Sequence, residues 1–363
     1  MSTARALVLE APRRLVPAEL PLPELAEDDG LLRVEACGLC GTDHELFTGA
    51  LPSSGPFIPG HESVGTIEAL GPKAAARWGV EVGDRVAVEV FQSCRTCGQC
   101  QAGLYRRCER HGLADMYGYN PLTKPPGLWG GYAEFQYLAP DSILLPVPPA
   151  MDPALATMFN PLGAGIRWGV TVPGTKAGDV VAVLGPGVRG LSAAAAVKEA
   201  GAAFVMVTGV LPQDAERLEL AAAFGADLVV DVAATNPAKA LRKATGDGAD
   251  VVVDVTAKAP QALGQAVDVA KVGGTVVLAG TRASAETPGF WPDNIVYKEL
   301  RLLGALGVDT GAYQAALDLL GTGRYPFADL PRRCAPLSET EDLVLAMGGE
   351  RGQTPPVHGV VVP

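Results

Sequence analysis

The sequence is short of basic residues and of long apolar runs. Lysine and arginine number 29 against 40 aspartates and glutamates, which gives a net charge of -11. Proteins that bind nucleic acid neutralise phosphates with lysine and arginine, so this balance argues against a nucleic-acid partner. No apolar run approaches the length of a membrane span, and the start lacks the pattern of a signal peptide, since it runs directly into strand-like residues 6–9. We therefore expect a cytoplasmic protein with no membrane partner and with reduced cysteines.

A chain of 363 residues is long enough for two domains. Apolar alternation at 31–36 and 85–90 predicts short strands of a small, irregular β-barrel in the first part of the chain. Residues 117–132, rich in proline, glycine and aromatics, are interpreted as an ordered surface loop, although core packing of each aromatic is as consistent with the pattern. After about residue 162 strands alternate with helices, which predicts a parallel sheet. The expected fold class is α/β.

Four cysteines lie within fifteen residues of one another: Cys94, Cys97, Cys100 and Cys108. Two tight Cys-x-x-Cys turns and a fourth thiolate can surround one tetrahedral zinc and leave no open position. The predicted site is therefore structural. A disulfide cluster, a set of ordinary cysteines and an iron–sulfur cluster are the alternatives.

A glycine-rich loop follows the buried strand expected at 179–184 and opens an alanine-rich helix expected at 191–200. Gly185 allows a tight turn, Gly187 allows close approach to a pyrophosphate, and Gly190 lets helix and strand pack. With further strands expected at 204–207, 228–230, 251–253 and 275–278, and a strand-like segment at 300–306, the pattern indicates a Rossmann domain. The predicted cofactor-binding residues are Gly185, Pro186, Gly187, Val188, Arg189, Gly190, Thr208 and Gly209.

The choice between NAD and NADP depends on the end of the second strand. NAD enzymes place an acidic residue there to hold the ribose hydroxyls, whereas this chain has Thr208 and Gly209. The arginine expected for NADP is also missing from that point, and Arg217 lies further along the chain. We expect NAD(P) with a slight preference for NADP. Arg189 stands at a position where a cation meets the pyrophosphate or a charged substrate, or is simply solvated.

Three more motifs complete a recognisable order: Gly38–Asp43 (Gly-Leu-Cys-Gly-Thr-Asp), Gly60–Glu62 (Gly-His-Glu) and Gly83–Val86 (Gly-Asp-Arg-Val). Together with the cysteine cluster and the glycine-rich loop, the chain resembles the zinc-dependent medium-chain dehydrogenases, the alcohol and polyol dehydrogenase family. The resemblance implies a GroES-like catalytic domain over 1–161 with its structural zinc lobe at about 92–110. It also implies a Rossmann NAD(P)-binding domain over 162–307 and a return to the catalytic domain over 308–363.

The resemblance also implies a second, catalytic zinc. Cys40 and His61 match family ligands, and Glu62 is either a carboxylate behind them or, as in the sugar-dehydrogenase branch, a direct ligand. Asn160 stands where polyol dehydrogenases carry glutamate and alcohol dehydrogenases cysteine. Because Glu62 would make the site neutral, we predict that Cys40, His61 and Glu62 hold the metal and that Asn160 is a weak or water-mediated partner. A loosely bound or absent zinc is the alternative.

Thr42, Asp43 and His44, which follow Cys40 closely in the chain, complete the predicted catalytic set. Thr42 matches the family's hydroxyl that passes on the substrate proton, Asp43 could orient His61, and His44 could relay the proton to solvent. An ordinary polar loop is the alternative for Thr42 and His44.

The sequence thus predicts an oxidoreductase that interconverts an alcohol, polyol or sugar hydroxyl and a carbonyl by hydride transfer with NAD(P). Its partners would be a small-molecule substrate and further copies of itself, in a homodimer or homotetramer. A zinc-independent reductase of activated double bonds and a redox-silent nucleotide-binding or structural protein are the alternatives. The presence of Cys40 and His61 argues against the reductase.

Overall fold

The computed structural model describes residues 2–282, 285–288 and 290–363, and the chain forms two compact units. The first unit contains residues 1–159, 320–322 and 327–363, and the second contains residues 160–319 and 323–326. The chain first changes unit inside helix α5 (Phe159–Ile166), and it changes again within the last turn of α11 (Thr310–Thr322) and in the residues that follow it. Each unit is described below by itself.

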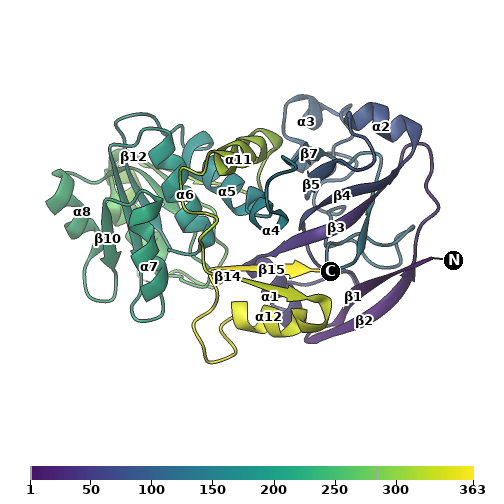
Figure 1. Ribbon diagram of the computed structural model, residues 1–363. Helices are drawn as coiled ribbons and strands as arrows, with labels where there is room; N and C mark the ends of the chain where they lie inside the picture. Colours follow the sequence, from purple (N-terminus) through teal and green to yellow (C-terminus); the bar gives the residue numbers. More distant parts are fainter. Residues whose placement is uncertain (1, 283–284, 289) are drawn as a thin grey trace. The chain divides into compact units, whose positions relative to one another are not determined.

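The first unit is built on mostly antiparallel strands, with β14 and β15 paired in parallel. A hairpin of β1 (Thr3–Ala11) and β2 (Arg14–Pro21) accompanies a seven-stranded sheet in the order β14-β15-β3-β4-β5-β7, with β6 paired to β3. The strands of this sheet are β3 (Gly30–Leu39), β4 (Glu62–Leu70), β5 (Arg85–Val88), β6 (Phe135–Leu138), β7 (Leu144–Pro146), β14 (Arg332–Pro336) and β15 (His358–Val362). The last strand pairs with β3, so the C-terminus completes a sheet that the N-terminal residues begin (Figure 1). This architecture agrees with the expected barrel-like catalytic domain.

Short helices connect these strands. They are α1 (Gly41–Thr48), α2 (Pro72–Trp78), α3 (Gly98–Gln101), α4 (Pro153–Ala156) and α12 (Thr340–Met347), with 3-10 turns at Tyr105–Arg107 and Leu337–Glu339. Helix α12 lies beside α1, although nearly 300 residues separate them in the chain (Figure 1). Helix α1, from the N-terminal part of the first unit, and helix α12, from its C-terminal part, are therefore neighbours.

The aromatic segment 117–132 belongs to the core of the first unit. Tyr117, Trp129 and Tyr132 are buried, and the Trp129 ring packs edge-on against Tyr137 at 5.0 Å between centroids. The Tyr117 hydroxyl accepts the backbone N–H of Ala139. The segment is an irregular loop whose middle, at 123–127, is partly exposed, but core packing holds for these rings, because large aromatic side chains gain from burial.

The second unit contains a six-stranded parallel sheet in the order β10-β9-β8-β11-β12-β13. Its strands are β8 (Val180–Leu184), β9 (Phe204–Gly209), β10 (Leu228–Asp231), β11 (Ala249–Asp254), β12 (Ala270–Leu278) and β13 (Arg301–Gly304). In chain order this is 3-2-1-4-5-6, the doubly wound arrangement that binds dinucleotides where the order reverses, between β8 and β11. The predicted Rossmann fold is confirmed.

Helices follow the strands of the second unit (Figure 1). Besides α5 and α11 they are α6 (Val188–Glu199), α7 (Ala215–Ala221), α8 (Pro237–Thr245), α9 (Ala262–Val269) and α10 (Asp293–Tyr297), with a π-helical turn at Arg167–Thr171 and a 3-10 turn at Ala222–Phe224. Local sequence explains α8 well: Asn236 accepts the Lys239 N–H at 2.9 Å, Pro237 opens the helix, and Gly246 (φ 87°) ends it.

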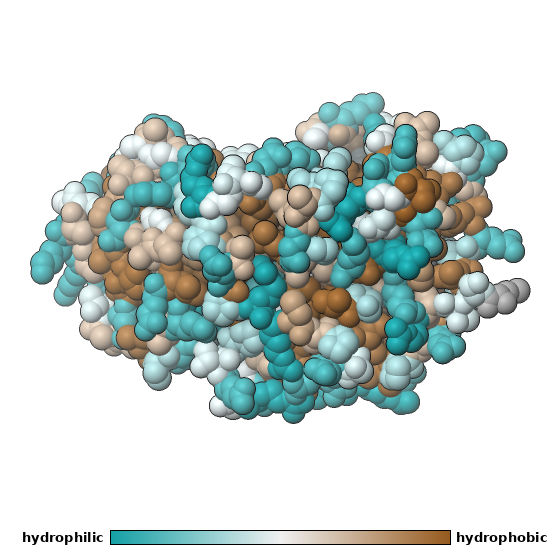
Figure 2. Space-filling view, viewed as in Figure 1, coloured by the Kyte–Doolittle hydropathy of each residue, from teal (hydrophilic) through white to brown (hydrophobic). Residues whose placement is uncertain are grey.

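The surface of the protein is mixed in polarity. On the face shown in Figure 2, hydrophobic residues occur in separate groups among hydrophilic ones. In the part of the chain that the structure describes, no helix combines the length and the apolarity needed to cross a bilayer.

Candidate functional site

Cys40 occupies the N-cap of α1, directly after β3 ends at Leu39. Its Sγ accepts the backbone N–H of Thr42 at 3.2 Å, and its own N–H donates to Asp43 Oδ2 at 2.9 Å. This reciprocal pattern is a capping box in which a thiol takes the place of the usual hydroxyl. The first turn of α1 therefore fixes both the position of the sulfur and that of the Asp43 carboxylate.

His61 and Glu62 come to Cys40 through the pairing of β3 with β4. These strands are antiparallel with Gly38 opposite Glu62, so the end of one meets the start of the other. Cys40 Sγ lies 3.3 Å from His61 Nε2, and one ligand atom from each of the three residues lies within 4.8 Å of the others. Donors that share a tetrahedral zinc lie about 3.4 to 3.8 Å apart, so the cluster has the dimensions of a zinc site.

The charges around this cluster favour a cation. Cys40, Asp43, His61 and Glu62 are all buried. Burial lowers the pKa of His61, but the charges of Cys40 and Asp43 outweigh it and raise this pKa to about 10. The buried His61 Nδ1 has no hydrogen-bond partner among the described residues and lies 3.7 Å from Asp43 Oδ1. A dication held by a thiolate, a carboxylate and an imidazole would offset this buried negative charge, so the donor set fits zinc.

The four predicted structural cysteines form a second cluster. The sulfur atoms of Cys94, Cys97, Cys100 and Cys108 all lie within 4.8 Å of one another. All seven cysteines of the chain are free thiols. Cys94 and Cys100 have their sulfurs 3.8 Å apart. This is close to the separation of about 3.8 Å expected across a tetrahedral zinc and far from a disulfide bond of about 2.05 Å.

Local backbone groups favour the thiolate form of two of these cysteines, whereas burial raises the pKa of Cys100 to about 11. The N–H groups of Cys97 and Thr96 lower the pKa of Cys94 to about 5. Burial alone would raise the pKa of Cys108, but N–H donors from Cys94, His111 and Arg110 outweigh it and lower this pKa. Metal binding requires thiolates, so donors that stabilise thiolate favour it. The lobe fits a closed structural zinc site.

Asn160 has its hydrogen-bonding groups engaged within the second unit. Its amide N–H donates to the Tyr313 hydroxyl at 3.0 Å, and its oxygen accepts from Arg189 at 3.4 Å. The Arg189 guanidinium in turn lies over the Trp168 ring, 5.4 Å from its centroid. The weak-ligand role of Asn160 remains a prediction. Sequence reasoning missed Tyr313 and Trp168, because nothing in the local pattern links them to Asn160.

The glycine-rich loop connects β8 to α6 as expected. Gly185 has φ 100°, a left-handed conformation that suits glycine, and a Cβ on Gly190 would lie 1.8 Å from the Gly185 carbonyl oxygen. A Cβ on Gly187 would meet nothing within 4 Å, so the space beside this N-cap is open. The N-terminus of a helix with open space beside it is suited to a phosphate.

The end of β9 carries Thr208 and Gly209, both buried. In the loop that follows, Val210 N–H donates to Asp214 at 2.9 Å. Arg217 Nη1 lies 3.6 Å from Asp214 Oδ1, which brings this arginine beside the loop. Arg217 therefore lies beside the region predicted to select between NAD and NADP, although its distance along the sequence did not indicate this.

His44 is bound by a residue that sequence reasoning missed. Its Nε2 lies 2.7 Å from Glu350 Oε1, 306 residues away in the chain. Hydrogen bonds from Arg13 and His44 lower the pKa of Glu350 to about 2, and a carboxylate only accepts, so Nε2 of His44 carries the proton. Proton relay through His44 remains a prediction. No local motif could have revealed Glu350.

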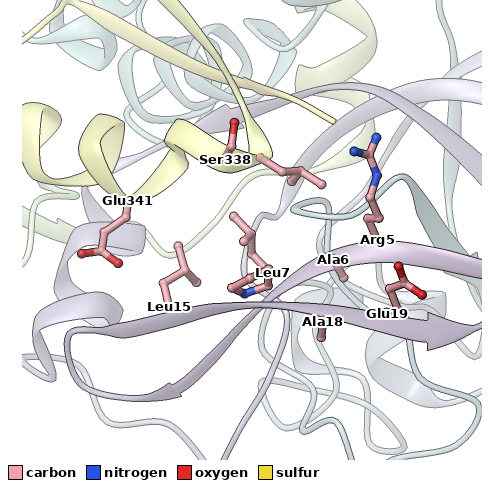
Figure 3. Close-up of a pocket in the computed structure, with 10 residues that line it drawn as sticks. Arg5, Ala6, Leu7, Leu15, Ala18, Glu19, Ser338 and Glu341 are labelled. Atoms are coloured by element: carbon pink, nitrogen blue, oxygen red, sulfur yellow. The ribbon is translucent and has the colours of Figure 1, made fainter.

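A separate pocket of about 520 Å³ lies in the first unit between β1, β2 and the chain entering α12 (Figure 3). Figure 3 shows Glu341 at one end, Arg5 and Glu19 at the other, and Leu7 and Leu15 between them. The full lining is Arg5, Ala6, Leu7, Leu15, Pro17, Ala18, Glu19, Leu337, Ser338 and Glu341. None of the predicted site residues lines it.

Comparison with known proteins agrees with this description. Residues 26–149 match the alcohol dehydrogenase GroES-like domain, and residues 189–322 match the zinc-binding dehydrogenase family. A Mycobacterium tuberculosis H37Rv protein named as a probable alcohol dehydrogenase is 66% identical over 363 residues, which cover 100% of this chain and 99% of that protein. Erythritol/L-threitol dehydrogenase of Mycolicibacterium smegmatis is 29% identical over 92% of this chain and 91% of its own. Among solved structures, a Sinorhizobium meliloti protein assigned as a zinc-binding dehydrogenase and bound to NADP is 30% identical, with a TM-score of 0.85 over 100% of both chains.

The two clusters predict about two zinc ions per chain. Cys40→Ser and Glu62→Gln are each expected to lower the zinc content to about one, because each removes an anionic donor from the Cys40 cluster. Asn160→Ala is expected to keep both ions, since the amide of Asn160 already has protein partners. Mass spectrometry of the metal content of purified protein measures this. A single zinc that Cys40→Ser leaves in place would show that only the four-cysteine lobe binds metal.

Proposed function

Since this chain belongs to the zinc-dependent medium-chain dehydrogenases, which interconvert alcohols and carbonyls with NAD(P), we propose that Cys40, His61 and Glu62 form its catalytic metal site. The observation that carries this proposal is the convergence of one thiol, one imidazole and one carboxylate, all buried, within 4.8 Å. Three protein donors leave one position of a tetrahedral zinc for substrate. The four-cysteine lobe leaves none and is assigned a structural role.

Bound zinc would supply Lewis acidity at the substrate oxygen, which would favour loss of the hydroxyl proton and transfer of hydride from the carbon that bears this oxygen to NAD(P). The chain's own residues hold and orient this site. Asp43 accepts the Cys40 N–H and stands 3.7 Å from His61 Nδ1, so it favours the His61 tautomer that presents Nε2 to the metal. Thr42 follows Cys40 by two residues, and we assign its hydroxyl to receive the substrate proton. His44 would pass that proton onward.

The proposed nucleotide site lies at the N-terminus of α6. The open backbone at Gly187 would receive the pyrophosphate, with the helix dipole favouring its charge. Arg189, held by Asn160 and Trp168, would add a positive charge at the second residue of this helix. The nicotinamide and ribose would then follow the crevice at the carboxyl ends of β8 and β11.

The activity is tested with a panel of secondary alcohols, polyols and sugars, each with NAD and with NADP. We expect oxidation of at least one class, a fall of about 100-fold or more in kcat/KM after chelation or in Cys40→Ser, and recovery of the chelated wild type on adding zinc. The polyol class is favoured because Glu62 as a direct ligand resembles the sugar branch. Reduction of an enone that persists after zinc removal would contradict the proposal, as would tight cofactor binding with no turnover on any substrate.

We propose a modest preference for NADP. Strand β9 ends in Thr208 and Gly209 where NAD enzymes carry an acidic residue, Arg217 lies beside the next loop in contact with Asp214, and a relative 30% identical to this chain is bound to NADP. Arg217→Ala is therefore expected to raise KM for NADP about tenfold, the loss of one charge-assisted contact, and to leave KM for NAD unchanged. Arg242→Ala, on the exposed face of α8, is the matched control. Equal effects on both cofactors would remove Arg217 from this role.

We also propose that the chain forms a homodimer or homotetramer. Support comes from apolar side chains on and around α10 that are largely exposed: Trp291 (71%), Val296 (71%) and Tyr297 (76%). Strand β13 nearby ends the parallel sheet and pairs only with β12 in the described sheet, so its other edge is available. Sedimentation velocity at micromolar concentration should give a dimer or larger species, and Val296→Asp should shift it to monomer. A monomeric wild type would contradict this proposal.

A further inference from the structure

A short segment after α12 holds helix α1 from the side. Glu350 accepts the Nε2–H of His44 at 2.7 Å, and its own N–H donates to Leu345 at the end of α12 at 2.9 Å. The His44 ring packs against Gly348 so closely that a Cβ there would lie 2.1 Å from it. The ring is 8% exposed and the Glu350 side chain 33%. His44 is therefore held in one rotamer by both contact and hydrogen bond.

The turn of the first hairpin completes this arrangement. Arg13, in the turn between β1 and β2, donates through both Nη atoms to the two carboxylate oxygens of Glu350, at 2.9 and 3.1 Å. Its backbone N–H donates to the Phe47 carbonyl at 2.6 Å, and its guanidinium lies 5.9 Å from the Phe47 ring centroid. Arg13 thus binds the C-terminal part of α1 and Glu350 at once. One carboxylate joins three segments: the hairpin turn, α1 and the end of α12.

His44 lies four residues after Cys40, one helical turn along the same face of α1. The first turn of that helix sets the metal-site geometry, because Thr42 N–H donates to Cys40 Sγ and Asp43 accepts the Cys40 N–H. A helix of eight residues has few hydrogen bonds of its own to hold its orientation. Its orientation depends on what its side chains contact.

We infer that Glu350 is a positioning residue for the metal site: by binding His44 and Arg13 together it fixes α1, and through α1 the Cys40 sulfur and the Asp43 carboxylate. This inference rests on the proposed function of the Cys40 cluster. Glu350 itself touches neither substrate nor metal in this role. Neither the family motifs nor the sequence spacing points to this residue.

Glu350→Gln tests the inference, since it keeps the size of the side chain and removes the charge. Cobalt is substituted for zinc in the full-length protein, and the thiolate-to-cobalt charge-transfer band is compared with that of wild type and Cys40→Ser. We expect a shifted or weakened Cys40-dependent band, release of that metal to a chelator about tenfold faster, and a lower kcat with KM for NAD(P) unchanged. The band of the four-cysteine lobe should stay constant and serves as the internal reference.

Glu134→Gln is the matched control. Glu134 pairs with Arg5 through two side-chain hydrogen bonds in the same unit, but nothing in the described contacts links it to α1. If Glu350→Gln does not fold, His44→Leu removes the same contact from the other side and should give the same spectrum. A Cys40-dependent band that both variants leave unchanged overturns the inference alone. A wild-type spectrum that Cys40→Ser does not alter overturns the proposed metal site, and the inference with it.

Discussion

The antiparallel pairing of β3 with β4 is the constraint on which the proposed metal site depends. It sets Gly38 opposite Glu62 and thereby brings the chain leaving β3, with Cys40, to the chain entering β4, with His61. The space between them is narrow: a Cβ on Gly38 would lie 2.3 Å from Glu62 Oε2. A slip of one residue in this register would point Glu62 to the other face of the sheet and separate the three donors.

This geometry has an electrostatic cost that a metal offsets. Two buried carboxylates and a thiol around one imidazole are unfavourable in a low-dielectric interior, because charges lose hydration without full compensation. A dication at the centre would convert the repulsion into coordination, and its binding energy would then contribute to folding. The core of the second unit is instead apolar. Its central strands are nearly continuous runs of valine and alanine buried on both faces, and apolar burial stabilises it.

Local sequence patterns predicted those parts of the protein whose interacting residues lie close together in the chain. The cysteine turns and the glycine-rich loop between β8 and α6 are complete within about fifteen residues, so their residue types and spacing were sufficient. The structure added what only tertiary contact can create. Glu350 reaches His44 from 306 residues away, and the aromatic residues between 117 and 132 pack inward because a core formed by other strands accepts them. Hydrophobic periodicity carries no information on either partner.

Asn160 and Arg189 depart from the family pattern at two separate positions of the sequence. In the second unit their side chains are joined by a hydrogen bond. The amide oxygen accepts from the guanidinium, and the amide nitrogen donates to Tyr313. A carboxylate at position 160 would form an ion pair with Arg189 instead of standing ready for a metal, so a neutral amide and a nearby cation are mutually consistent. The absence of a carboxylate at position 160 therefore does not deprive the proposed metal site of a ligand. Cys40, His61 and Glu62 all belong to the first unit, and in the proposed site they would supply three protein ligands, two of them anionic, without Asn160.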